Sequence, residues 1–123
     1  MAFLVFFKIE TSSYWKTHYT FLKESKPVSK TLSKSFIDLL LINTFIPIKF
    51  MYLKSLGKTD FSDLIGIVEA IKPEKNTIVS KFNDLKINTI NAFETQALLQ
   101  LKNEFCNKKL CLHCEIGKEM LGK

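Results

Sequence analysis

The stretch SKSFIDLLLINTFIPIKFMYLKSL, residues 33–56, decides the fold class of this chain. It is apolar, contains no glycine, and offers Ser33 or Ser35 as a side chain that can cap the first turn of a helix. We therefore expect one long helix that stops at Gly57. Pro47 should kink or split this helix, because proline lacks a backbone N–H and its ring clashes with the preceding turn.

The same stretch also bears on membrane insertion. Between Phe36 and Leu53 it is the most apolar part of the chain, yet it contains Asp38, Asn43, Pro47 and Lys49. A charge at the centre of a bilayer costs about 2.5–3.5 kcal/mol, so we expect a core helix and no membrane contact. Residues 1–8, a helix tail or short strand, lack the basic start and cleavage site of a signal peptide.

Working outward from this stretch, the apolar periodicity predicts three more helices, at residues 60–71, 74–86 and 92–105. A shorter helix should begin at Ser12 or Ser13, residues 20–32 should form a loop, and a last turn or helix should end the chain. The residues expected to face inward in the three main helices are Phe61, Leu64, Ile65, Val68, Ile71, Ile78, Val79, Phe82, Leu85, Phe93, Ala97, Leu98, Leu101 and Phe105. The predicted fold is all-α: an irregular bundle of four to five helices with a cysteine-containing C-terminal loop, in a single domain spanning residues 1–123.

The charge balance limits the partners that this chain can recognise. The net charge is +6, which attracts polyanions such as nucleic acid, yet all eighteen cationic side chains are lysine. Arginine makes the bidentate contacts that read guanine or grip a phosphate. The composition therefore predicts weak, non-specific polyanion binding or simply a solvated basic surface.

The three cysteines, Cys106, Cys111 and Cys114, lie in the C-terminal stretch FCNKKLCLHCEIG with the spacing C-x4-C-x2-C. A tetrahedral zinc site needs four ligands, and His18 on the Trp-Lys-Thr-His-Tyr segment could supply the fourth. Zinc is thus the first candidate metal, although no cofactor is certain. The bunched, odd-numbered cysteines do not suggest a disulfide framework, and they favour a cytoplasmic protein.

Two other interpretations of these cysteines stay open. An iron–sulfur cluster fits the spacing but lacks a fourth cysteine. The loop also resembles the cluster loop of helix-hairpin-helix DNA glycosylases, and that resemblance implies DNA contacts for Lys108 and Lys109. The simplest interpretation is three reduced thiols that fill apolar space. A catalytic thiol has little support, because nothing near Cys114 and His113 would orient a base.

A family resemblance rests on several motifs in order: YWKTHYTF at 14–21, IDLLLINT at 37–44 with Pro47, PEKN at 73–76, and the block from Asn91 to Cys106 with CLHCEIG after it. From about residue 9 to residue 123, the chain resembles the C-terminal part of a bacterial family catalogued as domain of unknown function 2851. The resemblance implies a fragment of a longer protein whose missing N-terminal portion is its partner and has nuclease-like motifs. It implies no activity for this chain.

The expected function is therefore modest. No general base, paired carboxylates, phosphate loop or nucleophile elbow can be assembled from the sequence, so we expect no catalytic residue here. The leading hypothesis is a non-catalytic helical accessory domain of a larger intracellular protein, with weak nucleic-acid binding. The alternative is a metal-binding structural module attached to a nuclease-like protein. An exposed apolar face should also permit self-association.

Overall fold

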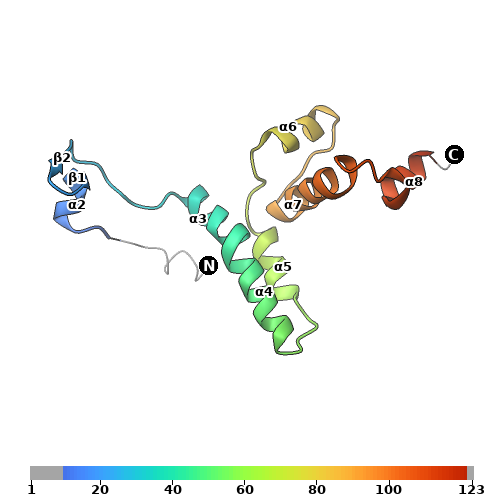
Figure 1. Ribbon diagram of the computed structural model, residues 1–123, viewed down its shortest axis with the longest axis horizontal. Coiled ribbons are helices and arrows are strands. Elements are labelled where there is room, and N and C mark those ends of the chain that lie inside the picture. The colour runs from blue at the N-terminus through green and yellow to red at the C-terminus, as the bar shows by residue number, and fades with distance from the viewer. Residues whose placement is uncertain (1–9, 122–123) are drawn as a thin grey trace. The chain divides into compact units, whose positions relative to one another are not determined.

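The computed structural model describes residues 10–121, and the helix tail or strand expected at residues 1–8 lies outside that range. The chain divides into two compact units, Met1–Leu56 and Gly57–Lys123. Helices dominate both units and one small two-stranded sheet accompanies them, so the all-α fold class is confirmed (Figure 1). The single domain expected over residues 1–123 stays a prediction.

The described part of the first unit begins with the short helix that the sequence predicted, and a hairpin follows where a loop was expected. Helix α2 spans Ser13–Thr17, and strands β1 (His18–Thr20) and β2 (Lys23–Glu24) pair antiparallel. Leu22 makes the turn possible by adopting a φ of 65°, a left-handed conformation that non-glycine residues seldom take. The loop predicted at residues 20–32 is therefore wrong over 20–24, because a strained turn replaced the glycine or asparagine that usually signals a hairpin.

The long helix predicted after Ser33 is confirmed, with bounds Lys34–Ser55. It consists of α3 (Lys34–Leu40), the π-helical turn η1 (Leu41–Phe45) and α4 (Ile46–Ser55) in direct succession (Figure 1). The Ser33 hydroxyl accepts the Phe36 N–H at 3.2 Å and caps its start.

Pro47 does not split this helix, because the π turn comes just before it. In that turn the Ile46 N–H donates to the Leu41 carbonyl, one residue farther back than in an α-helix. The Asn43 amide donates to the Leu39 carbonyl at 3.0 Å and satisfies one more acceptor there. Widening by one residue gives the proline ring room within a continuous helix.

The expectation of a core helix is met only in its first half. Ile37, Leu41 and Ile42 are buried, whereas α4 buries no side chain. The helix Lys34–Ser55 is long and apolar enough to cross a membrane by length and composition, and 17% of its most apolar window is buried. Apolar residues surround α4 instead of gathering on one side, so no single packing face can cover them.

The second unit packs helices around α7 (Ala92–Gln100), which contacts both α5 (Ser62–Glu69) and α6 (Thr77–Asp84). The buried side chains of this unit are Leu64, Val68, Ile71, Val79, Ala92, Thr95 and Cys114. The described part of the chain ends with a π turn η2 (Leu101–Cys106), a 3-10 turn η3 (Cys111–His113) and α8 (Glu115–Leu121). The predicted helices thus exist, with α5 and α6 a few residues shorter than expected.

The inward face predicted for the α7 segment is partly wrong. Phe93 is 44% exposed and Ala97 is exposed as well, whereas Ala92 and Thr95 are fully buried. Small residues face the core here because α5 and α6 both press on the same short helix and leave little room for large side chains. Leu85, also predicted to face inward, is 70% exposed.

Candidate functional site

The cysteine loop places its three thiols in different environments. Cys106 ends the π turn η2 and is exposed, Cys111 begins the 3-10 turn η3 and is exposed, and Cys114 is buried. The Cys114 N–H donates to the Cys111 carbonyl at 3.2 Å, which closes a tight turn between the two residues. The Lys118 N–H then donates to the Cys114 carbonyl at 2.8 Å and connects the turn to α8.

Gly117 fixes the position of this turn against α8. A Cβ atom at Gly117 would lie 2.2 Å from the Cys111 carbonyl oxygen and 2.9 Å from its Cα. Both of those neighbours are backbone atoms, which cannot swing away as a flexible side chain can. Only glycine therefore allows α8 to rest on the Cys111–Cys114 turn in this way.

The predicted metal ligands belong to both units of the chain, with His18 in the first and Cys106, Cys111 and Cys114 in the second, so this site stays a prediction. Within residues 10–121, no group of three or more histidine, cysteine, aspartate or glutamate side chains is placed to hold a metal ion. The zinc and iron–sulfur interpretations accordingly stay predictions, which metal analysis of protein purified without chelator would check. A zinc content below about 0.2 equivalents, with no absorbance above about 400 nm, would exclude both.

His18 lies in the aromatic cluster of the hairpin. Its ring stacks on that of Tyr14 with centroids 3.9 Å apart, and Nδ1 lies 2.9 Å from the Tyr14 carbonyl oxygen. Trp15 contacts both Tyr14 and Phe21 edge-on, at 5.0 and 5.2 Å between ring centroids. These contacts give His18 a structural role that does not depend on a metal.

The two lysines predicted to touch nucleic acid are both exposed, and Lys108 has an acidic side chain as its neighbour. Lys108 forms an ion pair with Glu104 at 2.5 Å, which offsets its charge locally. Lys109 occupies a left-handed backbone conformation, with φ 55°, and its N–H donates to the Cys106 carbonyl at 3.1 Å. The Lys109 backbone thus helps to close the turn that follows η2.

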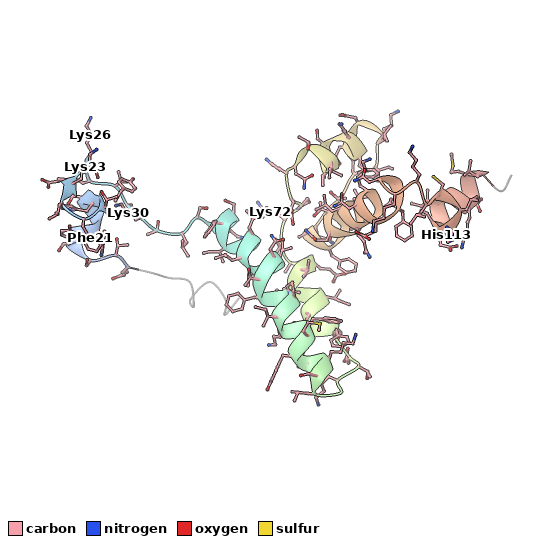
Figure 2. All side chains as sticks on the ribbon, viewed as in Figure 1. Phe21, Lys23, Lys26, Lys30, Lys72 and His113 are labelled. Carbon is pink, nitrogen blue, oxygen red and sulfur yellow. The ribbon has the colours of Figure 1, made fainter. Side chains whose placement is uncertain are left out.

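A second basic surface, which sequence reasoning missed, surrounds the hairpin. We call it the hairpin surface, and it comprises Lys16, Tyr19, Phe21, Lys23, Lys26 and Lys30. Tyr19 and Phe21 are 65% and 75% exposed. Figure 2 shows Phe21, Lys23, Lys26 and Lys30 around the hairpin and the chain that follows it.

Lys30 holds this surface together from the far end of the loop. Its ammonium group donates to the His18 carbonyl and lies 3.6 Å from the centroid of the Tyr19 ring, a cation–π contact. Lys16 and Lys30 also line a groove of about 530 Å³ in this unit. Four lysines among the aromatics of residues 16–30 were the visible signal, but the hairpin is what gathers them into one small part of the fold.

The structure thus defines a mostly helical protein with a lysine-rich aromatic hairpin and a C-terminal pair of neighbouring thiols. The chain belongs to the family described as "Protein of unknown function (DUF2851)", whose model matches residues 2–77. No curated protein and no solved structure matches the chain. The matched range includes the hairpin surface and ends before the cysteines, so it is shorter at the C-terminal side than the resemblance predicted.

Proposed function

We propose that this chain is a non-catalytic helical accessory module that binds polyanions, above all single-stranded nucleic acid, weakly and without sequence specificity. The hairpin surface supports this proposal, because it combines free lysine charge with exposed aromatic rings. We place the module inside the cell, as part of a larger protein, where nucleic acid is an abundant polyanion.

The charge of the segment that contains the hairpin, residues 10–31, supports electrostatic binding to polyanions. Residues 10–31 contain four lysines and two glutamates. The ion pairs found within residues 10–121 join Lys34, Lys108 and Lys118 to neighbouring carboxylates. Lys16, Lys23 and Lys26 take part in none of these ion pairs. Unpaired lysines release counterions when they neutralise phosphates, and this release gives affinity without reading sequence.

The exposed rings support the preference for single strands. Phe21 and Tyr19 present flat apolar faces, and a base that stacks on an aromatic side chain contributes about 1–3 kcal/mol of binding. Lys30 keeps the Tyr19 ring in place from one side. Unstacked bases are accessible only in single strands, so duplex DNA should bind through charge alone.

The test compares two double variants by fluorescence anisotropy with a labelled random-sequence single strand. K23Q/K26Q should weaken binding and lower the slope of log K against log salt by about 0.7 for each phosphate that is no longer neutralised. The matched control, K108Q/K109Q, removes the same charge from the cysteine loop and should change binding much less. Equal reductions of affinity in the two variants, or no binding at about 50 mM salt, would contradict the proposal.

A third variant separates stacking from charge. F21A should weaken single-strand binding by about 1–3 kcal/mol and leave the salt slope unchanged, because it removes a ring and no cation. Duplex binding should be unaffected by this change. A parallel loss of affinity for duplex and single strand would show that Phe21 supports the hairpin fold and does not touch bases.

A further inference from the structure

We propose that Cys111 and Cys114 form a dithiol–disulfide pair that exchanges reversibly with low-molecular-weight disulfides. This inference is independent of the polyanion-binding proposal, since it concerns the other unit of the chain. It rests on the turn geometry, on the unequal exposure of the two cysteine residues and on the glycine that holds the turn.

The turn brings the two residues within disulfide reach. The 3.2 Å hydrogen bond from the Cys114 N–H to the Cys111 carbonyl closes an i to i+3 turn. Such a turn holds its end Cα atoms less than about 7 Å apart, and disulfides commonly span Cα separations of about 4.4–6.8 Å. The bond can therefore form with local side-chain rotation, and the helices on either side keep their places.

The unequal exposure of the two cysteine residues gives them different roles. Cys111 is exposed, so a disulfide from solution can reach it, whereas Cys114 is buried with 8% exposure. An accessible thiol that attacks and a shielded thiol that resolves the product are what a two-step exchange requires. Cys106 is exposed too, but it lies in η2, before the turn that joins the other two.

Gly117 keeps the pair in this arrangement. Because a Cβ there would collide with the Cys111 backbone, α8 fits against the turn only with glycine at this position. The Lys118 N–H bond to the Cys114 carbonyl adds a second fixed point. The turn is thus supported on its own backbone, and the sulfurs remain the only parts of the pair that must move.

The exchange balances in two steps. The Cys111 thiolate attacks one sulfur of the small disulfide, forms a mixed disulfide and expels the other half as a thiolate, which takes up the proton that Cys111 released. The Cys114 thiolate then attacks the Cys111 sulfur, forms the intramolecular bond and expels the second half, which takes up the proton from Cys114. The pair loses two electrons, and the small disulfide becomes two thiols.

The experiment uses the full chain, reduced and then equilibrated in buffers with graded ratios of reduced to oxidised glutathione. Remaining thiols are blocked with N-ethylmaleimide, and the protein is digested with trypsin and weighed. Trypsin cuts after lysine, so Cys111 and Cys114 leave together in the peptide 110–118, while Cys106 leaves in 103–108. The expected result is that peptide 110–118 carries no N-ethylmaleimide and weighs about 2 Da less than the reduced, unlabelled peptide, because two hydrogens are lost. Cys106 should stay alkylated.

Single variants test the assigned roles. C114S should accumulate a glutathione adduct on Cys111, because nothing resolves it, and C111S should gain little adduct on the shielded Cys114. C106S is the matched control and should keep the oxidation of peptide 110–118 unchanged. Circular dichroism of each reduced variant shows whether its fold is intact. If C111S or C114S does not fold, the oxidation of peptide 110–118 in C106S still tests the inference.

Three results would overturn the inference. One is a crosslink between peptides 103–108 and 110–118, which would make Cys106 the partner. Another is independent glutathione adducts on Cys106 and Cys111 of the unmodified chain with no internal bond. The third is three thiols that stay reduced at every glutathione ratio.

Discussion

Thr95 is the residue on which the second unit's packing depends most directly. It is fully buried, its hydroxyl donates to the Ala92 carbonyl at 2.9 Å, and it accepts the Glu74 N–H at 3.4 Å. The Gln96 amide also donates to the Glu74 carboxylate at 2.6 Å. The Thr95 hydroxyl therefore connects α7 by a hydrogen bond to the segment that follows Pro73.

We expect Thr95→Val to destabilise the protein by about 1–3 kcal/mol, because it keeps the shape of the side chain and leaves the Glu74 N–H without an acceptor. Urea denaturation followed by circular dichroism measures the change. Thr77→Val, at an exposed position, is the control and should shift stability by about 0.5 kcal/mol or less. Equal effects at both sites would show that the buried hydroxyl contributes nothing specific.

Asp60 provides the pH dependence at this scale. Its carboxylate accepts the Ser62 N–H at 2.9 Å, and this bond, with a second one from the Ser62 side chain, lowers the pKa of Asp60 below its ordinary value. A lowered folded-state pKa means that the stabilisation is complete above the unfolded pKa of about 3.9 and is lost as the pH falls through the folded value.

We therefore expect Asp60→Asn to be slightly less stable than the unmodified chain near neutral pH, with the difference shrinking below about pH 4. Urea denaturation near neutral pH and below about pH 4 measures the free energy of unfolding of both proteins. Asp84→Asn removes the same charge elsewhere in the unit and serves as the control. A difference between the unmodified chain and Asp60→Asn that does not change with pH would contradict the assignment.

At the scale of the element, some helix starts were predicted correctly and others were not. Ser33 caps α3 and α7 begins at Ala92, both as expected. In contrast, α6 begins at Thr77, after Asn76, whose side chain accepts the N–H groups of Ile78 and Val79 at 3.1 and 2.9 Å. The hairpin was missed because its turn relies on Leu22, which has no turn preference in sequence. Local preferences fix helices, but pairing between strands depends on contacts that periodicity does not encode.

The candidate site was only half visible for the same reason. The cysteine spacing could be read directly, and the turn between Cys111 and Cys114 follows from it. Which thiol is buried depends on how α8 lies against that turn, and therefore on Gly117. The hairpin surface likewise became apparent only with the strand pairing, which gathers its lysines and rings around one hairpin.

Two glycines give a matched prediction for the elements that contain them. Gly117→Ala should destabilise the docking of α8 by about 1–3 kcal/mol, because its Cβ meets the Cys111 backbone. Gly66→Ala in α5 has open space within 4 Å and should stabilise the protein by about 0.4–1 kcal/mol. Urea denaturation gives the sign, and hydrogen exchange shows whether residues 110–121 open first. A neutral Gly117→Ala would contradict the close approach.

At the scale of the whole molecule, the uncovered apolar surface of the long helix stands out. Ile48, Met51 and Tyr52 in α4 are each at least 60% exposed, and Phe36 in α3 is 47% exposed. Soluble monomers seldom leave so many large apolar side chains together in water. Their burial against a second copy of the chain would remove this cost, in line with the self-association expected from the sequence.

We accordingly expect the isolated chain to associate reversibly, with a sedimentation coefficient that rises with concentration. I48E/M51E should weaken association at least about tenfold, or about 1.4 kcal/mol, because it places charges in the contact. K54E, at the end of the same helix, is the charged control. A chain that stays monomeric yet floats with lipid vesicles would show that a membrane covers this helix, as its length and composition permit.

The π turn at Leu41–Phe45 has an evolutionary consequence. One additional residue within a helix rotates all later residues by about 100° about the helix axis. This turn therefore sets the rotation of the α4 side chains about that axis relative to those of α3. A descendant whose gene lost a single codon there would keep the helix but turn its second half, and would crowd Pro47 against the carbonyl behind it. A one-position gap at this place in an alignment of relatives therefore marks a helix whose second half is rotated. Aligned positions after such a gap lie on different sides of the helix, so substitutions at them are not equivalent.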